Sequence, residues 1–204
     1  MNSRGYAVAI CAWVIATLGL VPSANAQTSG GTGWYIGTGI GSGFGAKYSV
    51  RGTTVTFSDF FRGTTDKSPL LGLNIINVGA TLGPNWLVGF TGSSVVQTAK
   101  APGGDVRLQI NNYLVSGTWF PAEQGFFLRG GFGGANIQTE SPGFSDDVGG
   151  TGILFGLGYA LRLGGGNHHI TFTLDHSRQS YGSSTTQPEK SQFSAAYVGY
   201  MYRH

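Results

Sequence analysis

The chain has 204 residues, of which 36 are glycine and only 10% are charged, and its formal net charge is +3. This is too little charge to cover a soluble surface, since soluble domains carry about 25% charged residues. An aromatic content of 13% argues against disorder, and the nearly balanced charge gives no reason to expect a nucleic-acid partner. Because no apolar run is long enough for a membrane-spanning helix, the composition favours a membrane β-barrel.

The first 26 residues have the organisation of a secretory signal peptide. Arg4 supplies a positive charge, an apolar segment follows, and the segment ends in an A-x-A cleavage site. We expect cleavage between Ala26 and Gln27, which leaves one β-barrel domain, residues 27–204. A transmembrane helix is the alternative, but the apolar segment is shorter than the ~20 residues that a span needs. Cleavage would also remove the single cysteine, so the mature chain would have no disulfide.

Eight segments of the remaining chain carry apolar residues at every second position. Successive side chains of a β-strand point to opposite faces, so this period predicts strands. The change of parity between Ile75 and Ile76 predicts a β-bulge, and the parities of Ile110 and Tyr113 disagree, which leaves the register of that strand open. The predicted strands are 34–43, 70–82, 86–96, 106–120, 126–138, 151–163, 168–177 and 191–202.

The segment 151–177 has the clearest two-faced pattern. Its two arms are each about ten residues long, with a continuous apolar face and a face of small or polar residues. This length suits a strand that crosses a bilayer at about 45°. The alternative is a secreted, soluble β-sandwich or lipocalin-like barrel with its apolar faces turned inward.

The connections between the predicted strands alternate between long and short. In an up-and-down meander this places every long loop at one end, as in outer-membrane barrels, so we predict an all-β, eight-stranded antiparallel transmembrane barrel. Aromatic residues next to the short turns predict a girdle at one membrane interface. These residues are Trp34, Trp86, Trp119, Phe126, Tyr200 and Tyr202.

The Gly-Trp-Tyr-Ile-Gly-x-Gly opening, the alternating loops and the aromatic last strand resemble the small outer-membrane barrel proteins of Gram-negative bacteria, the OmpA/OmpX-like and opacity-type group. The resemblance implies a place in the bacterial outer membrane, contact with outer-membrane lipid and lipopolysaccharide, and insertion by the barrel-assembly machinery. In that group the last strand ends in a terminal aromatic residue. Tyr202 matches this signal, although Arg203 and His204 follow it. We expect a monomer.

Three charged residues, Arg129, Arg162 and Asp175, fall on the predicted lumen parity of neighbouring strands. A charge facing lipid would cost about 2–4 kcal/mol near the midplane, so we expect them inside the barrel as an ion pair or polar network. An alternative is that they select solutes in a narrow pore. Because an eight-stranded barrel is just wide enough to be filled by side chains, and its other lumen residues are small, a thin channel of low conductance is conceivable.

Two motifs suggest chemistry but lack the required spacing. The alternate glycines of residues 37–45 form no G-x-G-x-x-G, so we expect them to let a narrow barrel curve. Lipid A deacylases hold a His and a Ser two residues apart, whereas here His176 and Ser177 are adjacent and must point to opposite faces. His168 and His169 are expected to be solvated turn residues. We therefore predict no catalytic residue, cofactor or metal.

The segments 44–69 and 139–150 are the remaining candidates for function. Loops of this length usually carry binding or gating. The apolar residues of the first loop could form a β-ribbon with an exposed apolar patch or could fold inward as a constriction. These residues are Val55, Phe57, Phe60 and Phe61. We expect a non-enzymatic structural or surface-interaction barrel that binds an extracellular ligand at these two loops. The alternatives are a narrow channel and, more weakly, a lipid A-modifying hydrolase that uses His176.

Overall fold

The structure is a computed structural model that describes residues 33–204 except 123–124, 165 and 183–186. The expected signal peptide, with its cleavage site at Ala26 and Gln27, lies outside the described residues. Within the described ranges, no helix is long and apolar enough to cross a membrane.

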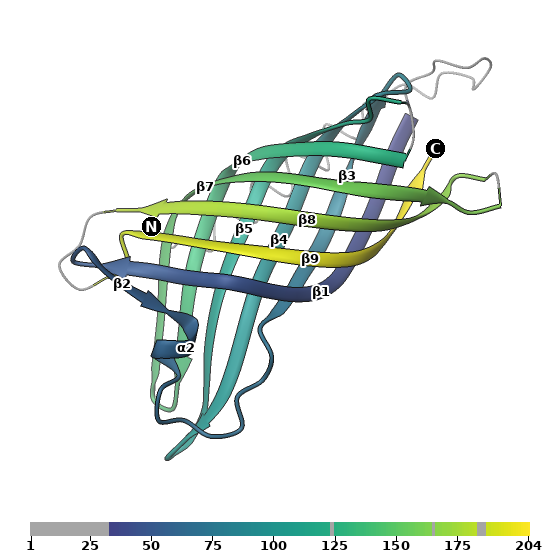
Figure 1. Cartoon of the computed structure of the whole chain (residues 1–204). Helices are drawn as coiled ribbons and strands as arrows, with labels where there is room; N and C mark the ends of the chain where they lie inside the picture. Colours follow the sequence, from purple (N-terminus) through teal and green to yellow (C-terminus); the bar gives the residue numbers. More distant parts are fainter. Residues whose placement is uncertain (1–32, 123–124, 165, 183–186) are drawn as a thin grey trace.

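The described strands form one antiparallel sheet that closes on itself (Figure 1). Each strand pairs with its neighbour in the chain, and the pairing of β1 with β9 closes the ring, while β2 pairs only with the far end of β1. The barrel therefore has eight strands, which confirms the predicted fold. The strands are β1 (Gly33–Val50), β2 (Thr53–Thr56), β3 (Leu71–Leu82), β4 (Trp86–Ala101), β5 (Gly104–Trp119), β6 (Gly125–Ser141), β7 (Phe144–Arg162), β8 (His168–Tyr181) and β9 (Lys190–Arg203).

The two ends of the barrel differ. At the turn end, β3 leads to β4, β5 to β6 and β7 to β8, and the C-terminus lies there too; the other connections lie at the loop end. The predicted loop at 139–150 is wrong, because β6 and β7 pair from Ser141 and Phe144 onward and only a two-residue turn separates them. Val148 is a buried apolar residue of this segment, but most of its neighbours on both faces are polar, so the hydrophobic alternation is interrupted while the backbone pairing continues. We call residues 94–101, 104–111, 136–141 and 144–149 the projecting sheet, which continues alongside the helix α2 (Phe57–Phe60) (Figure 1).

Two features of register explain the irregular sequence patterns. The pairing of β3 with β4 shifts between Asn74 and Ile76, which confirms the predicted bulge. Strand β5, in contrast, pairs with β4 and β6 without any shift. Leu108 and Ile110 therefore point into the barrel with Leu114. The parities disagree because the apolar residues of β5 face inward at the loop end and outward in the part of the strand that carries Tyr113 and Val115.

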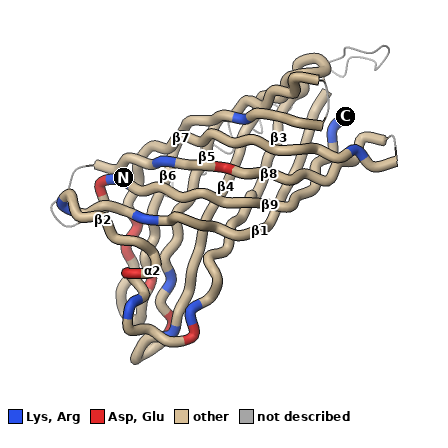
Figure 2. The backbone as a smooth tube through the Cα atoms, viewed as in Figure 1, with Lys and Arg blue, Asp and Glu red and all other residues tan. Residues whose placement is uncertain are grey.

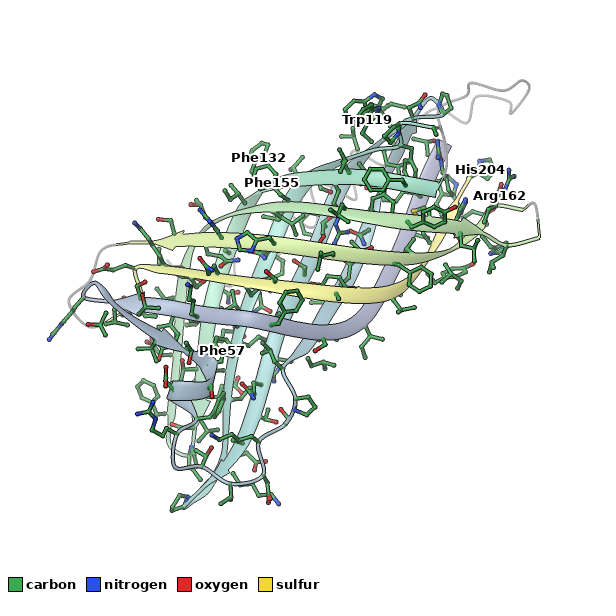
Figure 3. All side chains as sticks on the ribbon, viewed as in Figure 1. Phe57, Trp119, Phe132, Phe155, Arg162 and His204 are labelled. Carbon is green, nitrogen blue, oxygen red and sulfur yellow. The ribbon has the colours of Figure 1, made fainter. Side chains whose placement is uncertain are left out.

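The outward face of the barrel wall is an apolar belt. Phe132 of β6 and Phe155 of β7 are 68% and 64% exposed, and both point away from the wall (Figure 3). A soluble protein rarely exposes so large a continuous apolar surface, and a closed barrel with such a belt is the form in which strands cross an outer membrane. The chain is therefore an outer-membrane barrel. Other exposed members of the belt are Ile36, Ile40, Val88, Val115, Leu128, Ile153, Leu157, Phe172, Leu174 and Val198.

The interior contains two apolar clusters. The turn-end cluster surrounds Tyr35, which fits because the facing glycines Gly79 and Gly89 leave its ring room: a Cβ on either would lie within 3 Å of the ring or hydroxyl. The loop-end cluster is larger and includes residues from the α2 segment. Its members are Ala46, Phe57, Phe61, Val95, Ala99, Leu108, Ile110, Ile137, Val148, Tyr181, Phe193, Ala195 and Tyr197.

Candidate functional site

A buried ion pair lies between the two apolar clusters. The Arg129 Nε donates to Asp175 Oδ1 at 2.8 Å, and Nη2 donates to Oδ2, so the pair is bidentate. The two residues are only 8% and 1% exposed. Gly156 separates them in the register, and a Cβ there would lie 2.1 Å from Asp175 Oδ1. The glycine on β7 thus allows side chains from β6 and β8 to meet across it.

Arg162 is not part of this pair, which corrects the expected three-residue network. It is exposed at the turn end (Figure 3), and its Nε donates to the Gly166 carbonyl at 2.7 Å. The parity of a residue predicts which face of the strand it lies on, but not how far along the barrel axis it lies. Arg162 is paired with His169 at the very end of the β7–β8 ladder, so it lies at the rim of the barrel. His169 itself is only 7% exposed, so the expectation of a solvated residue was wrong for it.

A second polar network, which sequence reasoning missed, lies closer to the loop end. Asn112 donates to Ser177 Oγ at 2.9 Å, Gln179 donates to Asn112 Oδ1 at 3.0 Å, and Ser191 donates to Gln179 Oε1 at 2.7 Å. The Tyr181 hydroxyl lies 2.7 Å from Ser191 Oγ, and burial raises the pKa of Tyr181. The sequence left the register of β5 open. With the register in hand, Asn112 falls on the inward face, and this would have indicated a polar layer there.

The α2 segment closes the loop end from inside. Strand β2 forms a ribbon with β1, and the chain then turns inward so that Phe57 and Phe61 are 3% and 0% exposed in the loop-end cluster. A short ribbon therefore forms, but it carries no exposed apolar patch, because Phe57 and Phe61 lie beyond it and fold inward. The Thr56 hydroxyl caps the helix by accepting from the Asp59 N–H at 3.0 Å. Hydrogen bonds from Thr56 and then from Arg62 hold the pKa of Asp59 below its usual range.

Side chains occupy much of the described interior. A cavity of about 30 Å³ lies toward the turn end, lined by Tyr35, Leu87, Phe127 and Arg129 among others. A space of this size holds one or two water molecules. The hypothesis of a thin channel assumed that the lumen residues are small. Leu108, Ile110 and Phe61 are large apolar residues, and they also lie in the interior.

His176 lies on the outward face of β8, opposite Ser194 of β9, and its Nδ1 is 3.0 Å from Ser194 Oγ. The Arg178 Nε donates to His176 Nε2 at 3.3 Å. Nε2 is therefore the acceptor, so Nδ1 carries the proton and cannot accept one from Ser194. A general base needs the opposite arrangement, with a carboxylate behind the imidazole. Sequence reasoning missed Ser194 because only the register of β8 and β9 brings it to His176.

The predicted girdle residues lie on the outward face at the turn end. The rings of Trp34 and Tyr202 are 5.1 Å apart, and those of Trp86 and Trp119 are 6.1 Å apart. Exposed fractions of the others are 46% for Phe126 and 41% for Tyr200. Trp119 lies at the turn end in Figure 3. His168, expected to be solvated, is exposed and also contacts the Tyr200 hydroxyl.

Among the residues that the structure describes, no group of three or more His, Cys, Asp or Glu side chains could hold a metal ion. The alternate glycines of 37–45 lie within β1, which continues as a strand to Val50, so no helix N-terminus adjoins them to receive a phosphate.

Two solved structures share the fold of this chain. The attachment invasion locus protein Ail of Yersinia pestis, in complex with the heparin analogue sucrose octasulfate, has a TM-score of 0.51 and 13% identity, covering 87% of this chain and 100% of Ail. Neisserial surface protein A has a TM-score of 0.51 and 14% identity, covering 85% of this chain and 99% of its own. No protein-family model and no curated protein matches the chain. At such low identity the likeness is one of fold, and the chain has the fold of the small Gram-negative outer-membrane barrels that its sequence resembles.

Proposed function

We propose that the chain is a non-enzymatic surface barrel that binds an extracellular partner through the projecting sheet. The observation that carries this proposal is an open sheet edge. Residues 144–149 of β7 pair with β6 on one side, and no described strand pairs with them on the other, because the pairing of β7 with β8 begins at Gly150. Proteins usually cover or shorten such edges, and an exposed edge can accept a strand from a partner.

The turn between β6 and β7 indicates which backbone groups face outward at this edge. Ser141 and Phe144 flank a two-residue turn and pair across it. Antiparallel pairs alternate between hydrogen-bonded and non-hydrogen-bonded, so Ser145 and Asp147 direct their N–H and C=O groups away from β6. A partner strand would find these groups free.

The outward face of the projecting sheet supports the same proposal. Asp147 accepts from Asn136 at 2.9 Å and from Gln138 at 3.1 Å, and Asn111 donates to Asn136 Oδ1 at 3.1 Å. These bonds hold polar groups in fixed positions beside the open edge. A rigid polar face loses little conformational entropy when a partner binds.

The other two functions find less support. The residues Phe57, Phe61, Leu108 and Ile110 occupy the loop end of the lumen, where a channel needs open space. A hydrolase would need His176 to accept a proton from Ser194, and the hydrogen bond from Arg178 opposes this.

The test uses cells that display the full chain and two variants at one edge position. Ser145→Pro removes an outward N–H without touching a bond to β6, and Ser145→Ala is its matched control. The probes are immobilised extracellular-matrix proteins, because only a polypeptide can add a strand to the edge. We expect the wild type and Ser145→Ala to adhere to a probe and Ser145→Pro to lose most of that adhesion. Equal adhesion of both variants would contradict the role of the edge, and solute-sized conductance steps in planar bilayers would favour the channel instead.

A further inference from the structure

The two edges of the projecting sheet differ in what covers them. Along β4, the segment 65–68 of the same chain pairs with the edge. The backbone of Thr65 exchanges two hydrogen bonds of 2.9 Å with Lys100, and the Ser68 N–H donates to the Thr98 carbonyl at 2.8 Å. Along β7, no described strand covers residues 144–149. The side chains of β7 therefore determine which strand the open edge accepts.

The outward side of the open edge is acidic. Asp147 of β7 is exposed on the same face as Ser145, and Glu140 of β6 lies directly opposite Ser145. Asp146, which takes the inward parity, adds a third carboxylate to this stretch. None of the ion pairs among the described residues includes Glu140, Asp146 or Asp147. The hydrogen bonds that Asp147 accepts come from neutral side-chain amides, so no cation within ion-pair distance offsets the negative charge of the edge.

One cation faces Glu140 from the other side but forms no ion pair with it. Arg107 of β5 pairs with Glu140 in the register, and its Nη2 donates to Gln109 Oε1 instead. Arg107 also lies on the far side of β6 from the open edge. Figure 2 shows that most Asp and Glu residues lie toward the loop end. A strand added to β7 therefore meets the carboxylate of Asp147 before it comes near Arg107.

The inward side of the same edge is partly apolar. Val148 is 8% exposed and belongs to the loop-end cluster, and Phe144 at the tip is 57% exposed. Side chains of an added strand alternate between the two faces, as those of β7 do. One set of its side chains would cover Phe144 and Val148, and the other set would lie opposite Ser145 and Asp147. Because Ser145 is small, a long cationic side chain opposite it can extend over it to Glu140.

A second copy of this chain does not suit the edge. Two copies related by a two-fold axis would pair their edges antiparallel. The two registers centred on the edge place either Asp146 or Asp147 directly opposite the same residue of the other copy. Like charges directly opposite each other destabilise a sheet. The acidic edge therefore disfavours self-association and favours a partner strand of opposite charge.

We propose that the open edge of β7 selects an extended polypeptide segment in which lysine or arginine alternates with apolar residues. This inference rests on the proposed function, because it names the kind of partner that the edge accepts. Backbone hydrogen bonds to Ser145 and Asp147 hold the segment. Its cations lie over Asp147 and Glu140, and its apolar side chains pack against Phe144 and Val148.

The test measures the binding of labelled peptides to the full chain in phosphatidylcholine nanodiscs by fluorescence anisotropy, with empty nanodiscs as the blank. Three peptides of equal length alternate valine with lysine, glutamine or glutamate. A fourth is the lysine peptide N-methylated on its lysines, which keeps the charge and removes the donors that face β7. Cross-strand pairs of opposite charge contribute up to about fivefold each. We expect the lysine peptide to bind about tenfold more tightly than the glutamine peptide at low salt, and the other two to bind more weakly still.

Two pairs of variants separate charge from backbone pairing. The first charge variant, Glu140→Gln with Asp147→Asn, should weaken binding of the lysine peptide about tenfold and leave the glutamine peptide unaffected. Its matched control, Asp105→Asn with Glu189→Gln, removes two carboxylates elsewhere at the loop end and should change neither. Ser145→Pro should weaken binding of both peptides relative to Ser145→Ala. A heat-dependent shift on SDS gels verifies that each variant is folded.

The outcomes distinguish a failure of this inference from a failure of the proposed function. If the three unmethylated peptides bind equally and Ser145→Pro weakens all of them, the edge accepts a strand but the selection by charge is overturned. The same holds if both charge variants weaken the lysine peptide equally. If that peptide binds Ser145→Pro as well as Ser145→Ala, or if no peptide binds, strand addition itself is contradicted. A dimer of the chain that Ser145→Pro dissociates would make a second copy the occupant instead.

Discussion

At the scale of single residues, the most consequential feature is the buried pair of Arg129 and Asp175. Removing one member leaves a charge without compensation in a packed interior, which costs about 3–5 kcal/mol. We expect Asp175→Asn to lower the free energy of unfolding by this amount, measured by urea unfolding in detergent micelles. The double variant Arg129→Met, Asp175→Asn should recover most of the loss, since neither charge then remains.

Arg162 provides the control for that prediction. It has the same residue type and the same strand parity, but it is exposed at the turn end. Arg162→Met should change the free energy of unfolding by no more than about 0.5 kcal/mol. If Arg162→Met lowered the free energy of unfolding as much as Arg129→Met alone, Arg162 would have to belong to the interior network after all.

The capping contact of α2 leads to a prediction about pH. The Thr56 hydroxyl donates to Asp59 at 2.7 Å, and the pKa of Asp59 is lowered in the folded chain. The ionised form is the one that the cap stabilises, so its contribution is complete at neutral pH and is lost as the pH falls through the lowered pKa. Thr56→Ala should move the pKa of Asp59 up toward its ordinary value of about 3.9. An NMR titration of the Asp59 carboxyl measures this, and an unchanged midpoint would contradict the cap.

At the scale of the element, the sequence predicted the turn-end bounds of the strands more closely than the loop-end bounds. Near the turns, each bound lies within one residue of prediction, because Gly, Pro and Asn interrupt a clear apolar alternation. At the loop end, β7 begins at Phe144 instead of 151, and β1 runs to Val50 instead of 43. Beyond the belt the outward face is polar, while the inward face is partly apolar, with Ile137 and Val148 among its residues. The apolar-outward period of the belt therefore ends, although backbone pairing continues.

The α2 segment, with Phe57 and Phe61 buried in the loop-end cluster, acts as a plug of the loop end. Phe61 is fully buried, whereas Phe60 is half-buried and meets the Tyr48 ring at 6.4 Å. Phe61→Ala should weaken docking of the plug by about 3–5 kcal/mol, because it leaves a cavity in the loop-end cluster. Phe60→Ala should cost clearly less.

Trypsin cleavage after Arg62 and Lys67 reports how often the plug opens. We expect cleavage at least a hundredfold faster in Phe61→Ala and a smaller increase in Phe60→Ala. Equal rates for the two variants would show that Phe61 does not anchor the segment.

At the scale of the whole molecule, the sequence predicts the fold better than the site. The fold depends on which face of each strand is apolar, and this is visible in the chain itself. The position of Lys47 depends on a shift of register in β1 between Phe44 and Lys47. This shift moves Lys47 to the outward face, whereas simple alternation would place it inside. The pairs Arg178–Gln192 and His176–Ser194 likewise need the register of β8 and β9.

The membrane belt itself is tested by two phenylalanines of β7 that are almost equally exposed, Phe155 at 64% and Phe144 at 57%. Phe155 lies within the apolar belt, and Phe144 lies at the tip of the projecting sheet. Phe155→Arg should lower the free energy of unfolding in lipid vesicles by about 2–4 kcal/mol, because lipid would surround the charge. Phe144→Arg should change it by no more than about 0.5 kcal/mol, because water surrounds that position. The two side chains are similarly exposed, so the two variants should differ only if lipid surrounds one position and water the other. Equal small effects at both sites would mean that water covers the whole wall, as in a soluble barrel.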